Sequence, residues 1–143
     1  MRTIERRLIG AACVLSSLAA LPRVASAQAQ MLPLLDHIHL AVPDPAKGVD
    51  WYRTHFGGQP MTSEGVDRLM FDQTRLIFLR SDKAQPSSGS AIDHIGFSFT
   101  DLDAKVRELE AAGAKVVTPP RDIPGLPKLG FVEDTWGTRI EVM

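Results

Sequence analysis

Apolar and polar residues alternate strictly at two places in the chain, around residues 36–44 and around residues 93–101. Such alternation predicts two β-strands that each place one face on a core and leave the other face polar. The predicted core faces carry Ile38, Leu40 and Val42 in the first strand and Ile95, Phe97 and Phe99 in the second.

These two strands open the two copies of an internal repeat. Residues 36–44 (DHIHLAVPD) align with residues 93–101 (DHIGFSFTD) at a constant offset of 57, and Asp, His, Ile and the closing Asp recur in register. Residues 74–79 (TRLIFL) align with residues 138–143 (TRIEVM) at an offset of 64. Because both matches occur in the same order, the chain is predicted to contain one structural unit twice, with loops of different length.

Each copy continues with the pattern of an amphipathic helix. Asp44 and Asp101 are predicted N-caps, and Pro45 suits the first helical position, where its missing N–H costs no hydrogen bond. Glycines at 57–58 and at 113 predict the helix ends. Short strands are expected around 68–71, 74–79, 115–117, 131–133 and 138–143. The predicted order is therefore β-α-β-β-β, twice, which is an α+β fold.

These elements divide residues 35–143 into module one (35–80), a linker (81–91) rich in Ser and Gly, and module two (92–143). Residues 119–128 are expected to form a long loop within module two. That loop is interpreted either as a rim or lid over a site or as an ordered surface connection.

The first 27 residues have the three-part layout of a secretory signal peptide. Arginines at 2, 6 and 7 precede an uncharged apolar run from 8 to 21, and an Ala-x-Ala sequence predicts cleavage after Ala27. Residues 28–34 then form an N-terminal tail. We expect a periplasmic or secreted protein, and the paired arginines leave open whether export follows the general or the twin-arginine route.

Processing changes the composition of the chain. Its one cysteine, Cys13, lies in the leader, so the mature chain has no disulfide and no thiol for a metal. Cleavage of the leader also removes four arginines and Glu5. The mature chain then has 12 basic and 16 acidic residues and a net charge of −4. Without a basic block, nucleic acid and anionic membranes are not expected partners, and no stable membrane insertion is expected after processing.

The polar faces of the strands carry the candidate chemistry. His37 and His94 occupy the same place in the two repeats, and Glu141 lies on the polar face of the last strand. Two imidazoles and a carboxylate suit a divalent ion such as Zn, Fe, Mn or Ni and leave coordination positions open for substrate or water. His39 and Arg139 lie on the same faces by parity and are candidate substrate contacts.

At these residues the chain resembles the vicinal oxygen chelate superfamily, which includes glyoxalases, bleomycin resistance proteins and dioxygenases. The segments that carry the resemblance are DHI (36–38), WYR (51–53), FGG (56–58), DHIGF (93–97), DLD (101–103) and DTWGTRIE (134–141). The resemblance implies two βαβββ modules that form a curved eight-stranded mixed sheet, or cup, with helices on its outer face. It also implies metal ligation by His37, His94 and Glu141, chelation of a small oxygen-rich substrate, and, as one arrangement, a homodimer.

One position departs from part of the family. Members with glyoxalase or epimerase chemistry typically take a further carboxylate ligand from the last strand of the first module, where the repeat alignment gives Ile77. Apart from Glu141, the candidates for proton transfer are then His39, Tyr52 and His55. Of these, Tyr52 is interpreted as a packing residue and His55 as a surface residue, which leaves His39 and Glu141 as catalytic candidates.

These features are compatible with two functions from different classes. The first is a metal-dependent enzyme of the lyase, isomerase or dioxygenase type, acting on a small molecule. The second is a non-catalytic protein that binds or sequesters a small molecule in the same cup. Retention of all three ligand positions favours the enzyme, because a metal-free binding protein has no need of them.

Overall fold

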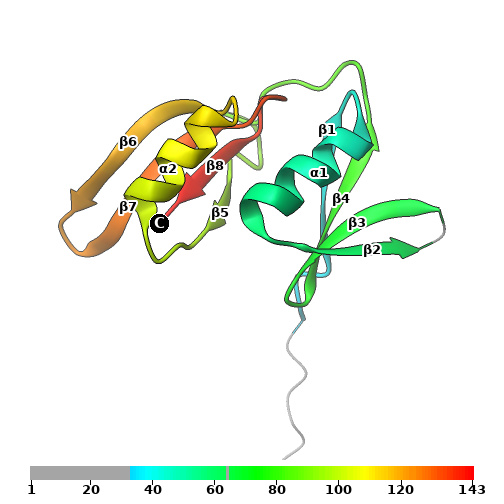
Figure 1. Ribbon diagram of the computed structural model, residues 1–143, viewed down its shortest axis with the longest axis horizontal. Helices are drawn as coiled ribbons and strands as arrows, with labels where there is room; N and C mark the ends of the chain where they lie inside the picture. Colours follow the sequence, from blue (N-terminus) through cyan, green and yellow to red (C-terminus); the bar gives the residue numbers. More distant parts are fainter. Residues whose placement is uncertain (1–32, 64) are drawn as a thin grey trace, which may run out of the picture. The chain divides into compact units, whose positions relative to one another are not determined.

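The computed structural model describes residues 33–63 and 65–143, and residues Pro33–Met143 form one compact unit. The predicted β-α-β-β-β order occurs twice (Figure 1), so the α+β fold of two βαβββ modules is confirmed. The elements of module one are β1 (His37–Val42), α1 (Pro45–Phe56), β2 (Gln59–Ser63), β3 (Val66–Phe71) and β4 (Thr74–Arg80). Those of module two are β5 (Ile95–Phe97), α2 (Leu102–Ala111), β6 (Lys115–Ile123), β7 (Leu126–Glu133) and β8 (Arg139–Val142).

The predicted signal peptide, residues 1–27, lies outside the described residues, as do residues 28–32 of the predicted tail. Within the described part of the chain, no helix is long and apolar enough to cross a membrane.

The strands form two four-stranded mixed sheets with the same internal order, β1-β4-β3-β2 and β5-β8-β7-β6. Strand β1 runs parallel to β4, and β5 runs parallel to β8. The remaining neighbouring strands are antiparallel. The eight expected strands are therefore present, and among the described residues no ladder of hydrogen bonds joins one sheet to the other. This leaves β1 and β5 as edge strands.

The strand register confirms the sequence alignment of the two modules. His39 of β1 lies opposite Ile77 of β4, and Gly96 of β5 lies opposite Glu141 of β8. Since His39 and Gly96 are equivalent by the offset of 57, Ile77 is the structural counterpart of Glu141.

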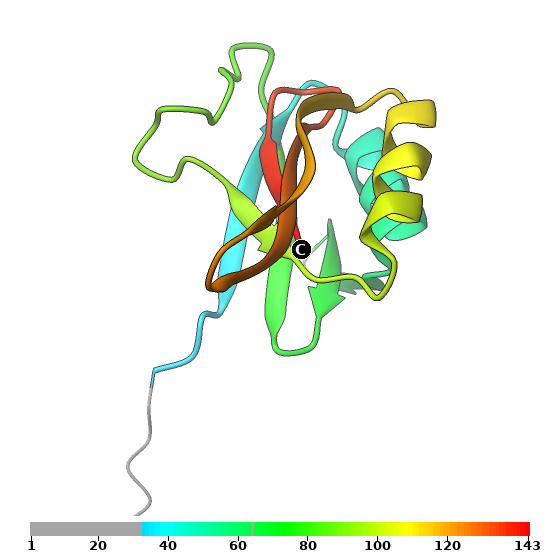
Figure 2. The same ribbon diagram turned by 90° about the vertical axis from the view of Figure 1, so that its left-hand side faces the viewer.

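Both helices begin where the sequence predicts. The side chains of Asp44 and Asp101 accept hydrogen bonds from the backbone N–H groups of Lys47 and Ala104, which satisfies one free donor at each N-terminus. Gly57 ends α1 in the left-handed conformation, with φ of 78°. The first helix packs on β3 and β4 and the second on β6 and β7, and both cover the same side of the strands (Figure 2).

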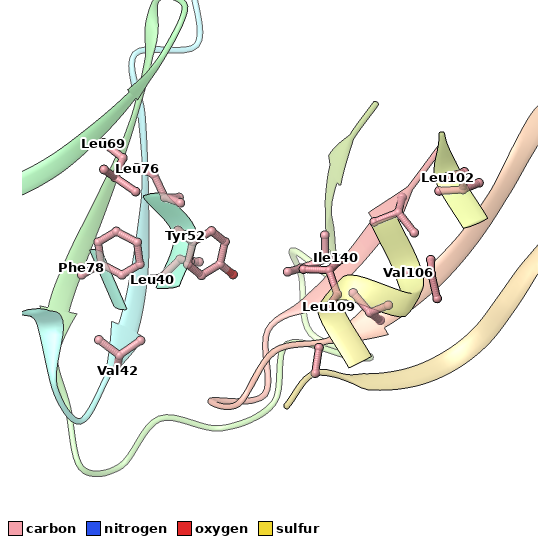
Figure 3. Packing of buried hydrophobic residues seen from close by; sticks show 13 residues of the cluster. Leu40, Val42, Tyr52, Leu69, Leu76, Phe78, Leu102, Val106, Leu109 and Ile140 are labelled. Carbon is pink, nitrogen blue, oxygen red and sulfur yellow. The ribbon is translucent and has the colours of Figure 1, made fainter. Parts of the chain in front are cut away.

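The buried residues come from the predicted strand faces and the inward sides of the helices (Figure 3). The main cluster comprises Leu40, Val42, Tyr52, Leu69, Leu76, Phe78, Leu102, Val106, Leu109, Ala114, Val132, Ile140 and Val142, and Ile77 and Leu129 are buried outside it. Tyr52 is fully buried, as expected of a packing residue, and its hydroxyl donates a 2.8 Å hydrogen bond to the Asp134 carboxylate of module two. This buried contact ties α1 to the turn between β7 and β8.

The structure corrects the interpretation of residues 119–128 as a long loop. Strand β6 continues to Ile123, β7 begins at Leu126, and the two strands form an antiparallel hairpin. Pro119 and Pro120 are tolerated because β6 is an edge strand and its pairing with β7 shifts register on either side of them. No lid is formed by this segment.

Candidate metal-binding site

The structure brings together two of the three predicted ligands, His94 and Glu141. His94 directly precedes β5, Glu141 lies in β8, and the parallel pairing of these strands places the two side chains on one face. His94 Nε2 and Glu141 Oε2 are 3.5 Å apart. Two donor atoms that bind one tetrahedral ion at about 2.1 Å lie about 3.4 Å from each other, so this pair fits a shared divalent ion.

The other nitrogen of the His94 ring is already engaged. Its Nδ1 lies 3.0 Å from Asp93 Oδ1, and the same oxygen accepts a 3.0 Å hydrogen bond from Arg139 Nη1. A backbone hydrogen bond from Gly89 is the largest cause that lowers the pKa of Asp93, followed by the bond to His94. The lowered pKa favours the ionised Asp93 carboxylate, which can accept a hydrogen bond from Nδ1 and so leave the Nε2 lone pair available to an ion.

Phe131 of β7 packs against the side chains of both His94 and Arg139. Its ring meets the His94 ring edge to face at 5.3 Å between centroids, and the Arg139 guanidinium lies over it at 4.2 Å. Arg139 thus contacts Asp93 and Phe131, two partners that the sequence did not indicate. Its predicted contact with substrate stays a prediction.

His37, the third predicted ligand, lies in the other sheet, on the edge strand β1. Its ring stacks on that of His39 with 4.7 Å between centroids, and its Nδ1 lies 2.5 Å from Asp36 Oδ1. Among residues 33–63 and 65–143, no three His, Cys, Asp or Glu side chains gather closely enough to hold a metal ion. A single chain therefore presents two ligands of the predicted set together and the third apart from them.

Two cavities border the strands that carry these residues. One, of about 270 Å³, is lined by residues that include His39, His94 and Trp136. The other, of about 490 Å³, is more apolar, and His94 is in its wall as well. The presence of His39 and His94 in the wall of one cavity agrees with a ligand contact by His39.

Three residues that contact the histidines or line the cavities were not predicted from the sequence. Asp36 and Asp93 bind the imidazoles that follow them, and Ser87 of the linker lines the smaller cavity. The repeated Asp-His dipeptide could have indicated the aspartates. Nothing in the linker's composition distinguishes Ser87 from a spacer residue.

His55, interpreted as a surface residue, is half-buried. Only 17% of its side chain is exposed, and its Nδ1 lies 2.7 Å from Glu108 Oε1 of α2. Lys105 of α2 also donates to the His55 carbonyl oxygen at 2.8 Å. His55 is therefore a contact between the two helices, because the end of α1 packs near α2.

Known families and structures match this chain over its described part. Residues 34–142 match the family model described as the Glyoxalase/Bleomycin resistance protein/Dioxygenase superfamily. No curated protein sequence shows significant similarity to the chain.

Several solved structures have a similar fold. The genomically encoded fosfomycin resistance protein FosX from Listeria monocytogenes is 20% identical with a TM-score of 0.65, covering 78% of this chain and 93% of its own. TioX from Micromonospora sp. ML1 is 22% identical with a TM-score of 0.57 (77% and 97% covered). A glyoxalase/bleomycin resistance protein/dioxygenase family enzyme from Burkholderia phytofirmans PsJN is 15% identical with a TM-score of 0.62 (76% and 95% covered). At these identities the likeness establishes the fold alone.

Proposed function

Because the chain belongs to the glyoxalase/bleomycin resistance protein/dioxygenase superfamily, we propose that it is a divalent-metal-dependent enzyme that chelates a small oxygen-rich substrate. The proposed ligands are His37, His94 and Glu141. The observation that carries the proposal is the 3.5 Å approach of His94 Nε2 to Glu141 Oε2, with His94 Nδ1 held by a carboxylate on its other side. Iron, zinc, manganese and nickel all suit two imidazoles and one carboxylate.

The residues around the pair define what the chain itself contributes. A divalent ion held there would polarise the substrate's oxygens and stabilise negative charge that develops on them. Glu141 serves as an anionic ligand, and His39 lines the adjoining cavity, where it can bind the substrate or transfer a proton. Ile77, 8% exposed, excludes a fourth carboxylate from module one, which favours a three-ligand chemistry of the lyase, isomerase or dioxygenase type.

We further propose that a second copy of the chain supplies His37. Each sheet ends in an edge strand, β1 or β5, and an unpaired edge is a ready partner for another strand. Three large apolar side chains lie exposed beside these edges: Leu34 at 69%, Leu35 at 62% and Ile92 at 68%. A homodimer that sets β1 of one copy beside β5 of its partner would cover them and bring His37 to His94 and Glu141.

Mixing two inactive variants tests both parts of this proposal. His37→Ala and Glu141→Ala each break every site in their own homodimer. After unfolding and refolding together, the mixed dimer regains one intact site, built from the unmutated His37 of one chain and the unmutated Glu141 of its partner. With random pairing we expect roughly a quarter of the wild-type metal content, measured by elemental analysis, and none in either variant alone.

The outcomes separate the two parts. Metal bound by wild type but not regained on mixing would place His37 in the same chain's site and refute the shared site. A wild-type protein that binds none of Fe(II), Zn, Mn or Ni would refute the enzyme proposal. Asp50→Ala, a change on the exposed surface of α1, serves as a control and should retain the full metal content.

The second candidate function is binding of a small molecule without catalysis. The apolar cavity of about 490 Å³ favours it, because its wall includes Leu35, Phe71 and Phe97 and few polar groups. A protein that binds an aromatic probe there while retaining no metal would support binding over catalysis.

We also propose that the protein is exported and that residues 1–27 are removed. The support is the arrangement of charge, apolar run and Ala-x-Ala sequence described above. Mass spectrometry of protein from the periplasm or medium should give Gln28 as the first residue. A chain that retains its leader in the cytoplasm would refute export.

A further inference from the structure

A carboxylate, a histidine and an arginine form the same cluster in both modules. In module two, Asp93 Oδ1 lies 3.0 Å from His94 Nδ1 and accepts a 3.0 Å hydrogen bond from Arg139 Nη1. In module one, Asp36 Oδ1 contacts His37 Nδ1 at 2.5 Å and accepts from Arg75 Nη2. The pairs Asp36/Asp93 and His37/His94 share the offset of 57, and Arg75/Arg139 share the offset of 64.

A backbone link accompanies each cluster. In module one the Arg75 N–H donates directly to the Asp36 carbonyl oxygen at 2.9 Å. In module two, the Ser87 hydroxyl lies between the equivalent groups: it accepts from the Arg139 N–H at 2.8 Å and donates to the Asp93 carbonyl oxygen at 2.8 Å. In both modules a hydrogen-bonded link therefore joins the backbone of the aspartate to that of the arginine. The link is direct in module one and passes through the Ser87 hydroxyl in module two.

We propose that Asp36 and Asp93, each held by the arginine of its own module, are positioning residues that fix the proton of His37 and His94 on Nδ1. This leaves the Nε2 lone pair of each ring free to bind the ion. The inference deepens the proposed function and rests on it for the identity of the ligand. The hydrogen bonds themselves do not depend on a metal.

The geometry supports a positioning role over a pair of incidental surface contacts. Each carboxylate oxygen receives the imidazole and the guanidinium together, so the arginine restrains the carboxylate that restrains the ring. In module two the ring is oriented so that its other nitrogen, Nε2, lies 3.5 Å from Glu141 Oε2. Carboxylates in this relation to a metal-binding histidine set both its tautomer and its orientation.

Nitrogen NMR on the metal-free protein tests the proposal directly. Long-range ¹H–¹⁵N spectra at pH 8.5, about two units above the usual histidine pKa, report which ring nitrogen carries the proton. We expect the Nδ1–H form for His37 and His94 in wild type. Free histidine prefers Nε2–H, so Asp36→Ala should shift His37 toward that form and leave His94 unchanged.

The module-two variant should give the reverse result. Asp93→Ala should shift His94 and spare His37, although it also removes the bond that Asp93 accepts from the Gly89 N–H. Asp36→Ala is thus the cleaner variant, since the side chain of Asp36 bonds only His37 and Arg75 among the described residues. The proposal is overturned if wild type already shows Nε2–H, or if each ring keeps its wild-type tautomer without its aspartate.

Metal affinity gives a second readout. Competition with a chromophoric chelator should show about a 10- to 100-fold weaker affinity for Zn²⁺ or Co²⁺ in Asp36→Ala and Asp93→Ala. Asp50→Ala is the matched control, because Asp50 also accepts from an arginine at 3.0 Å but bonds no histidine within the part of the chain that the structure describes. That variant should keep the wild-type affinity.

The failure of this inference can be told apart from the failure of the proposed function. Tautomers that respond to the aspartates in a protein that binds no metal would uphold the positioning role and refute the metal site. Metal bound with unchanged affinity in both aspartate variants, with unchanged tautomers, would uphold the metal site and refute the positioning role.

Discussion

The two modules share a scaffold but differ at the positions that can carry chemistry. Each has the same strand order, an aspartate-capped helix and an Asp-His-Arg cluster. On the face that bears the histidines, module two has small Gly96 opposite Glu141, whereas module one has His39 opposite Ile77. The aspartate and arginine that contact a histidine thus occur in both modules. The carboxylate that would form a ligand pair with the histidine, Glu141, occurs only in module two.

This difference shows which features the fold needs and which the site needs. The strand order and the helix caps lie where strands begin and helices start, so each copy uses them to fold, whereas the Asp-His-Arg clusters surround the proposed ligands. Glu141 and Ile77 occupy equivalent places in equally well-formed sheets, and Ile77 is buried at 8% exposure. The same place in the two sheets therefore holds a buried apolar residue in module one and a partly exposed carboxylate in module two, and this difference marks the position as a functional one.

The largest expected effect on stability comes from replacing Ile77 of module one with glutamate, the residue at the equivalent position 141 of module two. Ile77→Glu would place a carboxylate where a buried apolar side chain now lies, opposite His39 of β1. We expect the free energy of unfolding of the metal-free protein to fall by about 3 kcal/mol, because removing a carboxylate from water costs more than a neighbouring imidazole returns. Urea denaturation at neutral pH measures the change.

Ile77→Met is the matched control, since it conserves volume and polarity and should cost less than about 1.5 kcal/mol. If the Glu and Met variants proved equally stable, the two positions would be chemically interchangeable. The asymmetry between the modules would then have no basis in burial.

A second comparison concerns the helices. Tyr52 of α1 and Leu109 of α2 are equivalent by the offset of 57, and both are fully buried. Only Tyr52 crosses to the other module, where Asp134 accepts from its hydroxyl at 2.8 Å. Tyr52→Phe, which makes α1 resemble α2, should lower the free energy of unfolding by about 2 kcal/mol, because it leaves a buried carboxylate oxygen without this donor.

The pH dependence of this effect has a definite sign. Burial, then the Asp134 charge, raises the pKa of Tyr52 well above its usual value of 10.0. The folded pKa exceeds the unfolded one, so the contribution is fully present below pH 10 and is lost as the pH rises further. Thermal unfolding should show the gap between wild type and Tyr52→Phe narrowing above pH 10. A gap that widened there would contradict the buried hydrogen bond.

Much of each module could be predicted from the sequence, because the signals involved are local. Strand alternation, the capping residues Asp44 and Asp101 and the repeat offsets gave the element order and the equivalence of Ile77 with Glu141. The hairpin at 119–128 could not be predicted in this way. Prolines usually indicate a loop, and only the position of β6 at a sheet edge explains why two of them are tolerated in a strand.

The assembly of the site is less accessible to sequence reasoning than its parts. Parity and repeat position placed His94 and Glu141 on one face, as the structure confirms with their 3.5 Å approach. Whether His37 joins them depends on which edge strand lies beside which, and no local pattern encodes that pairing. The role of Ser87 was likewise hidden, because it depends on the separation of two backbone groups from different strands.

That serine provides a third way to test the comparison. Module one joins Arg75 N–H to Asp36 O directly, whereas module two needs the Ser87 hydroxyl between the equivalent groups. Ser87→Ala should lower the free energy of unfolding by about 1.5 kcal/mol, since one donor and one acceptor lose their partner together. Ser90→Ala, which removes one exposed bond to the Ile92 carbonyl, should cost less in the same urea titration. Equal costs would show that the bridge adds nothing to module two.

The smallest expected effect separates the two helix caps. The Asp101 side chain accepts from the Ala104 N–H at 2.9 Å, whereas the Asp44 side chain accepts from the Lys47 N–H at 3.3 Å. Pro45 also restricts the backbone to a helical φ angle in the first turn of α1, independently of the cap, and α2 has no proline there. Asp101→Ala should therefore cost about 1 kcal/mol and Asp44→Ala about 0.5 kcal/mol, at the lower end of measured caps.

Asparagine at the same two positions tells the hydrogen bond apart from the charge. Its side-chain oxygen caps a helix about as well as aspartate, so Asp44→Asn and Asp101→Asn should both stay close to wild type in thermal unfolding. If Asp44→Ala instead cost more than Asp101→Ala, the proline would not be compensating for the longer hydrogen bond. The first turn of α1 would then depend on its cap more than that of α2, and the order of the two modules in local stability would be reversed.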